Sequence, residues 1–191
     1  PCGNRQAFMQ PAAENYFAEQ KHPTALEIGG LVLIILIGAG LRFYRLSAQS
    51  VWFDESLSIA HAEAPPGEFL QTIAHGEGHP PLYFLLLRAM TYFGSDEVMM
   101  RLLSVAAGIA AIPLLFLFSR WLLGSATALT AAGLLALSPF AVYFSQEARP
   151  YALLSALSLA SCYALLLAVN KPSRSKWIIY TALTLDAVYT H

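Results

Sequence analysis

The sequence predicts an all-α, polytopic transmembrane helical bundle. Three observations lead to this class: 57% of the 191 residues are hydrophobic, only 12% are charged, and the charges leave long apolar blocks uninterrupted. An average soluble domain carries about 25% charged residues. Apolar runs of about 20 residues are long enough to cross a bilayer as helices. The net charge of −1 gives no indication of a nucleic-acid partner.

The apolar runs divide the chain into a polar N-terminal tail, residues 1–25, and a membrane domain, residues 26–191. Spans are predicted over residues 26–44, 102–121, 126–146 and 151–170, and a fifth apolar run opens at Trp177 and contains Asp186. Pro113 predicts a kink in the second span, and Pro139 lies inside the third. The chain opens on Pro1 and stops within or at the end of an apolar run. We therefore expect a fragment of a longer protein.

The polar connection over residues 46–80 predicts helices that lie in the membrane interface. Two short helices are expected over residues 55–64 and 68–75, separated by Pro65-Pro66-Gly67. The apolar run that follows, residues 81–94, is shorter than the length needed to cross a bilayer and carries Arg88 in its middle. This run predicts an interfacial or re-entrant helix rather than a crossing.

The basic residues predict the orientation. Lys171, Arg174 and Lys176 form the densest basic connection, so they are expected on the cytoplasmic side, although Arg42 and Arg45 oppose this trend. Counting spans back from that connection places the first loop and the third-to-fourth connection outside. The ionisable residues that this count gathers on the outer face are Asp54, Glu55, His79, Arg101, Glu147, Arg149 and His191.

Two short motifs on that face carry candidate chemistry. Asp54-Glu55 follows Trp52-Phe53 just past the first span, and paired carboxylates can divide the roles of base and cation ligand. The alternative is an ordinary acidic flank of a loop. Glu147 and Arg149 stand two residues apart between two uncharged spans, and a guanidinium can bind a phosphate through two parallel hydrogen bonds. The alternative here is a structural ion pair at a helix junction.

Two more residues on the outer face are weaker candidates for binding substrate. His79 precedes Pro80-Pro81, which restricts its backbone, and it is a better candidate than His75. Arg101 begins the second span, where the alternative is an arginine that extends its side chain to the interface.

Four motifs in this order resemble the first part of a bacterial membrane glycosyltransferase. They are Trp52–Glu55, His79–Arg88, Arg101–Ser104 and Ser145–Tyr151. The family is the protein O-mannosyltransferase-like group, glycosyltransferase family 39 type, of the GT-C superfamily, and the resemblance covers about residues 26–191. It implies a GT-C-like fold with many transmembrane helices and a large first outer loop that carries interfacial helices.

The resemblance also implies an activity. The enzyme would move a sugar from a polyprenyl-phosphate-linked donor to an acceptor hydroxyl on the extracytoplasmic face of a cell membrane, with inversion at the sugar carbon. Asp54 would be the catalytic base, and Glu147 would lie near the donor phosphate or its metal, a divalent ion such as Mg²⁺ or Mn²⁺. Arg149 and His79 would lie on the phosphate side. Tyr189-Thr190-His191 resembles a further family motif that faces the site, which makes His191 a second candidate metal ligand.

The remaining binding candidates on the same face are Glu55 and Arg101. Members of the family are longer, and the acceptor, which could be a glycan, a lipid or a protein, is usually recognised by parts that lie further along the chain. This chain alone is therefore expected to be inactive. Two alternatives stay open: a transporter or flippase of lipid-linked sugars, which would carry charges near the membrane midplane, and a non-catalytic membrane subunit.

Overall fold

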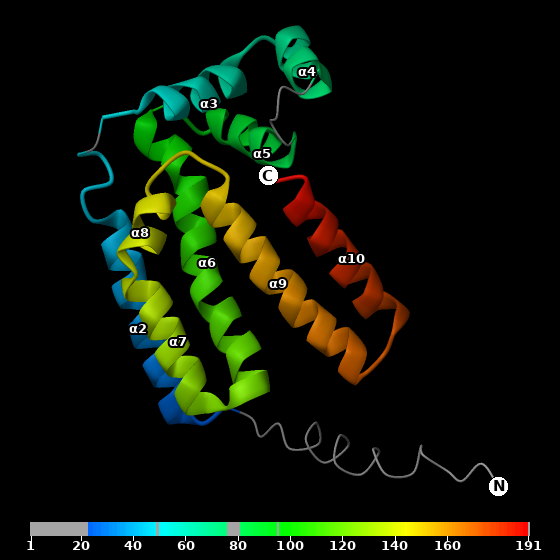
Figure 1. The fold of residues 1–191 in the computed structure, drawn as a ribbon. Helices are drawn as coiled ribbons and strands as arrows, with labels where there is room; N and C mark the ends of the chain where they lie inside the picture. Colours follow the sequence, from blue (N-terminus) through cyan, green and yellow to red (C-terminus); the bar gives the residue numbers. More distant parts are fainter. Residues whose placement is uncertain (1–22, 49, 76–80, 95, 191) are drawn as a thin grey trace, which may run out of the picture.

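The computed structural model describes residues 23–48, 50–75, 81–94 and 96–190, without the side chains of residues 72, 74 and 75. This part of the chain forms helices and contains no strand (Figure 1). The helices in chain order are α2 (Ala25–Phe43), α3 (Phe53–Glu63), α4 (Pro66–His75), α5 (Pro81–Thr91), α6 (Glu97–Leu123), α7 (Ser125–Leu137), α8 (Pro139–Ser145), α9 (Tyr151–Asn170) and α10 (Arg174–Val188). The all-α class is confirmed, while most of the predicted polar tail lies outside the described residues.

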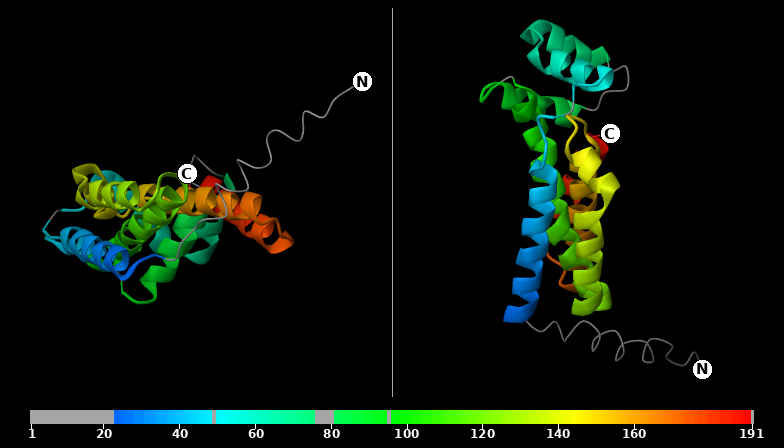
Figure 2. Two further views of the ribbon diagram at one scale, coloured as in Figure 1. Left: turned by 90° about the horizontal axis from the view of Figure 1, so that it is seen from below. Right: turned by 90° about the vertical axis from the view of Figure 1, so that its left-hand side faces the viewer.

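Helices α2, α6 and α9 are long and apolar enough to cross a membrane, with 19, 27 and 20 residues. They match the first, second and fourth predicted spans. Within its most apolar window, 44% of α6 is buried inside the protein but only 11% of α2. Helix α6 is therefore the central helix of the bundle, and α2 presents most of its surface outward. The views in Figure 2 show these helices side by side with the α7–α8 pair.

The third predicted span is a broken helix. Helices α7 and α8 together are long enough to cross, but they meet at a bend of 58°. Pro139, the first residue of α8, has no backbone N–H, so the hydrogen bond that would continue α7 past this point cannot form. Ser138 caps α8 instead, because its hydroxyl accepts a hydrogen bond from the Ala141 N–H at 3.4 Å. By contrast, α6 runs as one helix through Pro113.

The fifth apolar run forms α10. Over the described residues this helix is shorter than a helix that crosses a membrane. It has 15 residues and runs antiparallel beside α9 (Figure 1). The hydroxyls of Ser161 and Thr184 hydrogen-bond at 2.7 Å between these two helices. At the far end of α10, the Leu82 N–H donates to the Tyr189 carbonyl at 3.1 Å, so the end of α10 touches the start of α5.

Helices α3, α4 and α5 form a layer across one end of the bundle (Figures 1 and 2). The two short helices expected here are present as α3 and α4. Each begins two residues earlier than predicted. Helix α5 has 11 residues, about 16 Å of helix, which is half of a bilayer core. Its Arg88 donates to the carbonyls of Ala62 and Ala64 at 3.2 and 2.8 Å and lies 4.4 Å over the Phe69 ring. These contacts hold the arginine inside the layer, as expected for a helix that does not cross.

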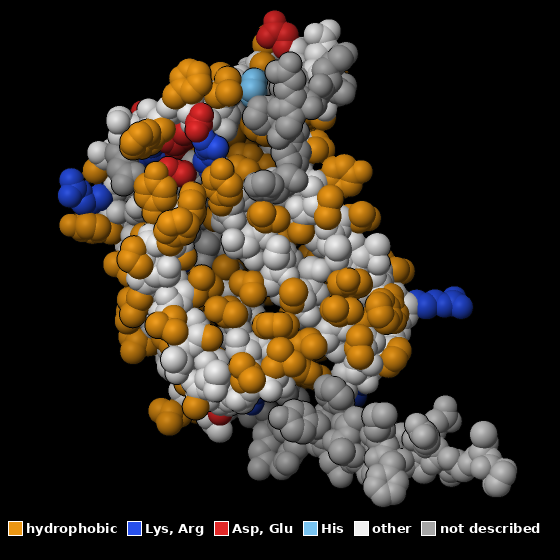
Figure 3. Space-filling model, viewed as in Figure 1, with side chains coloured by type: hydrophobic (Ala, Val, Ile, Leu, Met, Phe, Trp, Pro, Cys, Tyr) orange, Lys and Arg blue, Asp and Glu red, His pale blue; other side chains and the backbone are white. Residues whose placement is uncertain are grey.

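Charged side chains lie at the two ends of the bundle. Figure 3 shows acidic and basic groups ringed by hydrophobic side chains at the upper end and a largely uncharged face over the helices below. At the opposite end, Arg120 pairs with Glu27 at 3.3 Å. Asp54, at the start of α3, and Glu147, in the connection between α8 and α9, share the upper end, as predicted by counting the spans.

This arrangement makes a prediction about labelling. In the full-length protein without Cys2 and Cys162, single cysteines in place of the exposed residues Ser50 and Phe93 should react with an impermeant thiol reagent from the same side of the membrane. A cysteine in place of the exposed Lys171 should react only from the other side, because α9 crosses between them. Labelling of all three from one side in sealed vesicles would contradict the arrangement.

Candidate active site

Four chain segments meet at the upper end of the bundle. They are the end of α2, the start of α3, the start of α6 and the connection between α8 and α9. Each segment brings polar side chains to this end, next to the largely uncharged surface of the helices below it. The polar residues that the sequence predicted on the outer face and that the structure describes are Asp54, Glu55, Arg101, Glu147 and Arg149. His79 and His191 lie outside the described residues.

Asp54 and Arg149 form an ion pair between a carboxylate oxygen of Asp54 and the Nη2 atom of Arg149. The side chain of Asp54 is 65% exposed and that of Arg149 is 24% exposed, so the pair is open to solvent on the Asp54 side. The guanidinium also lies 5.8 Å from the centre of the Tyr151 ring. The two motifs that sequence analysis singled out, one on the first loop and one after α8, therefore meet in space.

Glu55 has a different environment from its neighbour, because it is buried. Arg101 donates to both of its carboxylate oxygens, from Nε at 2.7 Å and from Nη2 at 2.8 Å. The Ala148 N–H donates to Glu55 Oε1 at 2.8 Å, and Arg101 Nη1 donates to the Leu46 carbonyl at 2.7 Å. Only 2% of the Glu55 side chain and 1% of the Arg101 side chain are exposed. Protein groups surround both charges, so the contact of Glu55 and Arg101 with substrate stays a prediction, and the structure shows them in contact with each other.

These contacts act on the pKa of Glu55. Burial alone raises the pKa of a carboxyl, but the hydrogen bonds from Arg101 and from the Ala148 N–H, with the charge of Arg101, outweigh burial and lower the pKa of Glu55 below its ordinary value. Glu55 is therefore charged at neutral pH. Its charge holds three segments together: α3, α6 and the connection that carries Arg149.

Glu147 is half-buried on the other side of that connection, near the Tyr143 hydroxyl. The described residues contain no group of three His, Cys, Asp or Glu side chains that could hold a metal ion. Within this part of the chain Glu147 is thus the one predicted metal ligand, since His191 is not described.

Two residues of the site belong to motifs quoted in the sequence analysis but were given no individual role there. Ser104 donates its hydroxyl to the Arg149 carbonyl at 3.1 Å and is fully buried. Its spacing of three from Arg101 puts both on one face of α6, and this signal could have identified it. Tyr83 of α5 is also fully buried, and burial raises the pKa of its hydroxyl above the ordinary value. Nothing in the sequence distinguishes Tyr83 from the other aromatic residues near this surface.

A pocket of about 240 Å³ lies beside the ion pair, between α6, the α7–α8 bend and α9. Its walls are mainly apolar, from residues such as Leu135, Phe140 and Phe144, but Arg42 and Ser145 also line it. Tyr151 belongs both to this pocket and to the surroundings of Arg149, since Arg149 Nη1 donates to the Tyr151 hydroxyl at 3.5 Å. An apolar groove of this kind therefore ends next to a guanidinium.

The buried pair predicts a large effect on stability. Replacing Glu55 by Gln leaves the Arg101 charge buried and uncompensated, and such changes cost about 3–5 kcal/mol. The melting temperature of the purified protein should fall sharply, whereas Glu63→Gln, at an exposed carboxylate of the same helix, should change it little. Combining Glu55→Leu with Arg101→Met should recover part of the loss, because it removes both charges. Equal melting of the Glu55→Gln and Glu63→Gln proteins would contradict this view of the pair.

The same pair predicts a pH dependence. Because the pKa of Glu55 is lowered on folding, its contribution to stability is complete above the ordinary glutamate value of about 4.3 and is lost only as the pH falls through the lower, folded value. The acid-dependent part of unfolding should thus be smaller in Glu55→Gln than in the wild type. An identical acid profile in both would assign this stability to other carboxyl groups.

Comparison with known proteins agrees with the geometry. Residues 78–187 match a family model described as dolichyl-phosphate-mannose-protein mannosyltransferase. The match includes Arg101, Glu147 and Arg149 but begins after Asp54. Searches of curated proteins and of solved structures found no match. Since the matched residues make up more than half of the chain, the protein belongs to the dolichyl-phosphate-mannose-protein mannosyltransferase family, a family of GT-C membrane glycosyltransferases.

Proposed function

We propose that the full-length protein transfers a sugar from a polyprenyl-phosphate-linked donor to an acceptor hydroxyl at the extracytoplasmic face of the cell membrane, with inversion. The ion pair of Asp54 and Arg149 is the observation that supports this proposal most strongly. It joins a carboxylate suited to act as a base with a guanidinium suited to a phosphate, at the upper end of the bundle and next to Tyr151, which lines the apolar pocket.

In this proposal the reaction is a displacement at the sugar carbon. The acceptor oxygen forms the new bond to that carbon as its proton passes to the Asp54 carboxylate. The bond from the carbon to the donor phosphate breaks, and its electron pair leaves with the polyprenyl phosphate. Arg149 faces the additional negative charge on this phosphate, where a fixed positive group stabilises the transition state more than the ground state.

The pairing of Asp54 with Arg149 gives the proposal an order of events. Both Asp54 and the donor phosphate are ligands for one guanidinium, so the phosphate displaces the carboxylate when the donor binds. Asp54 then turns toward the acceptor, and its 65% exposure leaves room for this movement. A base that is released by the donor would limit abortive chemistry when no donor is present.

The apolar pocket beside Tyr151 suits the isoprenoid tail of the donor. It lies between helices that cross the apolar belt, so the tail would remain in a hydrocarbon environment while the phosphate reaches Arg149. The family takes its name from transfer of mannose from dolichyl phosphate mannose, and polyprenyl phosphate mannose is therefore the first donor to test.

The buried residues have positioning roles in this proposal. Glu55, held by Arg101, accepts a hydrogen bond from the Ala148 N–H, and Ser104 donates one to the Arg149 carbonyl. Glu147 lies on the phosphate side. A divalent ion, Mg²⁺ or Mn²⁺, held by Glu147 and His191 with His79 near the phosphate, is part of the proposal. Such an ion would neutralise phosphate charge, and loss of transfer on chelation with restoration by Mg²⁺ or Mn²⁺ would support it.

A transporter or flippase has less support, because the charges gather at the ends of the bundle and Arg88 lies in the α3–α5 layer rather than at mid-membrane. A non-catalytic subunit differs from the proposed enzyme in its response to loss of the base, which the next experiment measures.

Asp54→Asn keeps the size and polarity of the side chain but removes the proton acceptor. With the full-length protein in lipid nanodiscs and a radiolabelled polyprenyl phosphate mannose, turnover should fall by about a hundred- to ten-thousand-fold. Donor binding should be retained. Glu63→Gln on the same helix is the matched control and should keep wild-type turnover. Near-normal turnover of Asp54→Asn would place the base elsewhere, and a wild-type protein that never transfers would favour the non-catalytic alternative.

Arg149→Lys tests the phosphate role. A lysine keeps the charge but cannot form two parallel hydrogen bonds in one plane, so the Michaelis constant for the donor should rise by about tenfold or more. Glu147→Gln should also weaken binding of the donor or the metal, and it should lower the melting temperature less than Glu55→Gln does. An unchanged donor affinity in Arg149→Lys would contradict the proposed contact between the donor phosphate and Arg149.

A further inference from the structure

The bend between α7 and α8 creates a problem for the backbone. In a continuous helix the carbonyls of Leu135 and Ala136 would accept hydrogen bonds from residues 139 and 140. Pro139 has no N–H, and the bend of 58° moves the following turn away. Carbonyls without donors are costly inside a membrane protein, where no water reaches them.

Arg42, in the last turn of α2, supplies the missing donors. Its Nη1 donates to the Ala136 carbonyl at 3.2 Å and to the Gly38 carbonyl at 3.0 Å, and its Nη2 donates to the Leu135 carbonyl at 3.5 Å. The side chain is 1% exposed, and among the described residues no carboxylate lies within ion-pairing distance of it. The charge is thus compensated by the negative end of α7 rather than by an acid.

The same guanidinium reaches the other side of the bend. Its Nε donates to Ser145 Oγ at 3.2 Å, at the end of α8. Two glycines leave the space for this contact. A Cβ atom on Gly38 would meet Ile112 first, at 2.5 Å, and would stand 3.3 Å from Arg42 Nη1, and one on Gly108 of α6 would collide with the Ser145 side chain and stand 3.0 Å from Arg42 Nε. Close packing of three helices around one buried arginine depends on these small residues.

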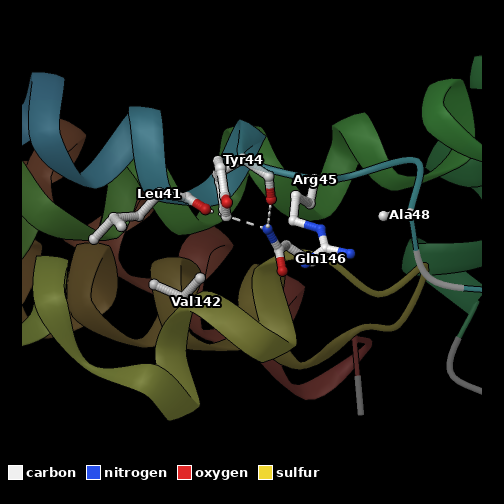
Figure 4. Close-up of a pocket in the computed structure, with 6 residues that line it drawn as sticks. All are labelled: Leu41, Tyr44, Arg45, Ala48, Val142 and Gln146. Carbon is white, nitrogen blue, oxygen red and sulfur yellow. Dashed lines mark hydrogen bonds between the residues drawn. The ribbon is translucent and has the colours of Figure 1, made fainter.

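A reciprocal contact runs from α8 to α2. The Nε2 atom of Gln146 donates to the carbonyls of Leu41, Arg42 and Tyr44 at 3.2, 3.1 and 2.9 Å, as Figure 4 shows for Leu41 and Tyr44. These carbonyls lie at the C-terminal end of α2, where a helix has no internal donors left. Each helix end is therefore capped by a side chain from the other, α7 by Arg42 and α2 by Gln146.

We propose that Arg42 and Gln146 are positioning residues of the active site, acting as a reciprocal clamp that sets the place of Glu147 and Arg149. The role of Glu147 and Arg149 in this inference rests on the proposed function. The clamp itself rests on the contacts of Arg42 and Gln146 alone. Ser145 and Gln146 directly precede Glu147, and the next fixed points are the Ala148 N–H on Glu55 and the Arg149 carbonyl on Ser104. Without the clamp the connection is held at one end only.

Hydrogen exchange of the full-length protein in nanodiscs, without substrate, tests the clamp. In Arg42→Met and Gln146→Glu, amides of residues 138–150 should exchange about tenfold faster or more, because buried carbonyls lose their donors. Amides of α9 beyond its first turn and of α10 should be unchanged. Gly108→Ala should have the same local effect, since it displaces Ser145 without altering charge.

Matched controls come from the same elements. Arg45→Met removes an exposed arginine three residues away, and Gly133→Ala adds a methyl group to α7 where nothing lies within 4 Å. Both should exchange like the wild type. Unchanged exchange over residues 138–150 in Arg42→Met and Gln146→Glu would overturn the clamp, and so would a uniform increase over all helices, which indicates a general loss of stability.

A second variant covers the case in which Arg42→Met fails to fold. Pro139→Ala restores an N–H that can donate to the Leu135 carbonyl. The double variant Arg42→Met/Pro139→Ala should therefore fold better than Arg42→Met. Additive losses in the double variant would overturn the capping role of Arg42. Because exchange requires no activity, this result is independent of the proposed function, which fails if the wild-type protein does not transfer a sugar from polyprenyl phosphate mannose. With an active wild type, Gln146→Glu should raise the Michaelis constant for the donor through Arg149.

Discussion

The buried ion pair of Glu55 and Arg101 is the interaction on which the upper end of the structure depends. It joins the first loop to the central helix, and through the Ala148 N–H it also holds the connection after α8. A buried pair adds little net stability compared with apolar residues, but loss of one partner is expensive. Its value here is geometric: the three segments reach one arrangement, and that arrangement sets the distance between Asp54 and Arg149.

A second constraint comes from the membrane, where every backbone group needs a partner. The protein bends α7–α8 at Pro139 and still satisfies the freed carbonyls, because Arg42 of α2 donates to them. The bend directs α8 across the end of α2, where Gln146 completes the contact. Arg42 lies at the opposite end of the bundle from the basic connection, whereas basic residues usually gather on one side of the membrane. Capping of α7 explains the position of Arg42, since this arginine serves the protein interior rather than the aqueous side.

Much of the fold could be predicted because apolar run length determines which helices cross. Residues 151–170 were predicted as a span and form α9 with the same ends. Run length also located the third span, since α7 and α8 together are long and apolar enough to cross, but it did not give their bend of 58°, which depends on donors from a distant helix. Counting spans brought Asp54 and Arg149 to one end. The roles of Arg42 and Gln146 could not be predicted, because their partners are backbone carbonyls and leave no trace in residue type.

The adjacent carboxylates Asp54 and Glu55 illustrate why position within a helix decides chemistry. Successive residues of α3 point about 100° apart, so one faces the protein and the other faces outward. Glu55 meets Arg101 in the interior, where two fixed donors hold it charged and immobile. Asp54 meets a partly exposed guanidinium, which a phosphate can compete for. A base must change partners during a reaction, whereas a structural charge must not. The exposure of Asp54 is compatible with its proposed role as base, and the burial of Glu55 gives Glu55 a structural role.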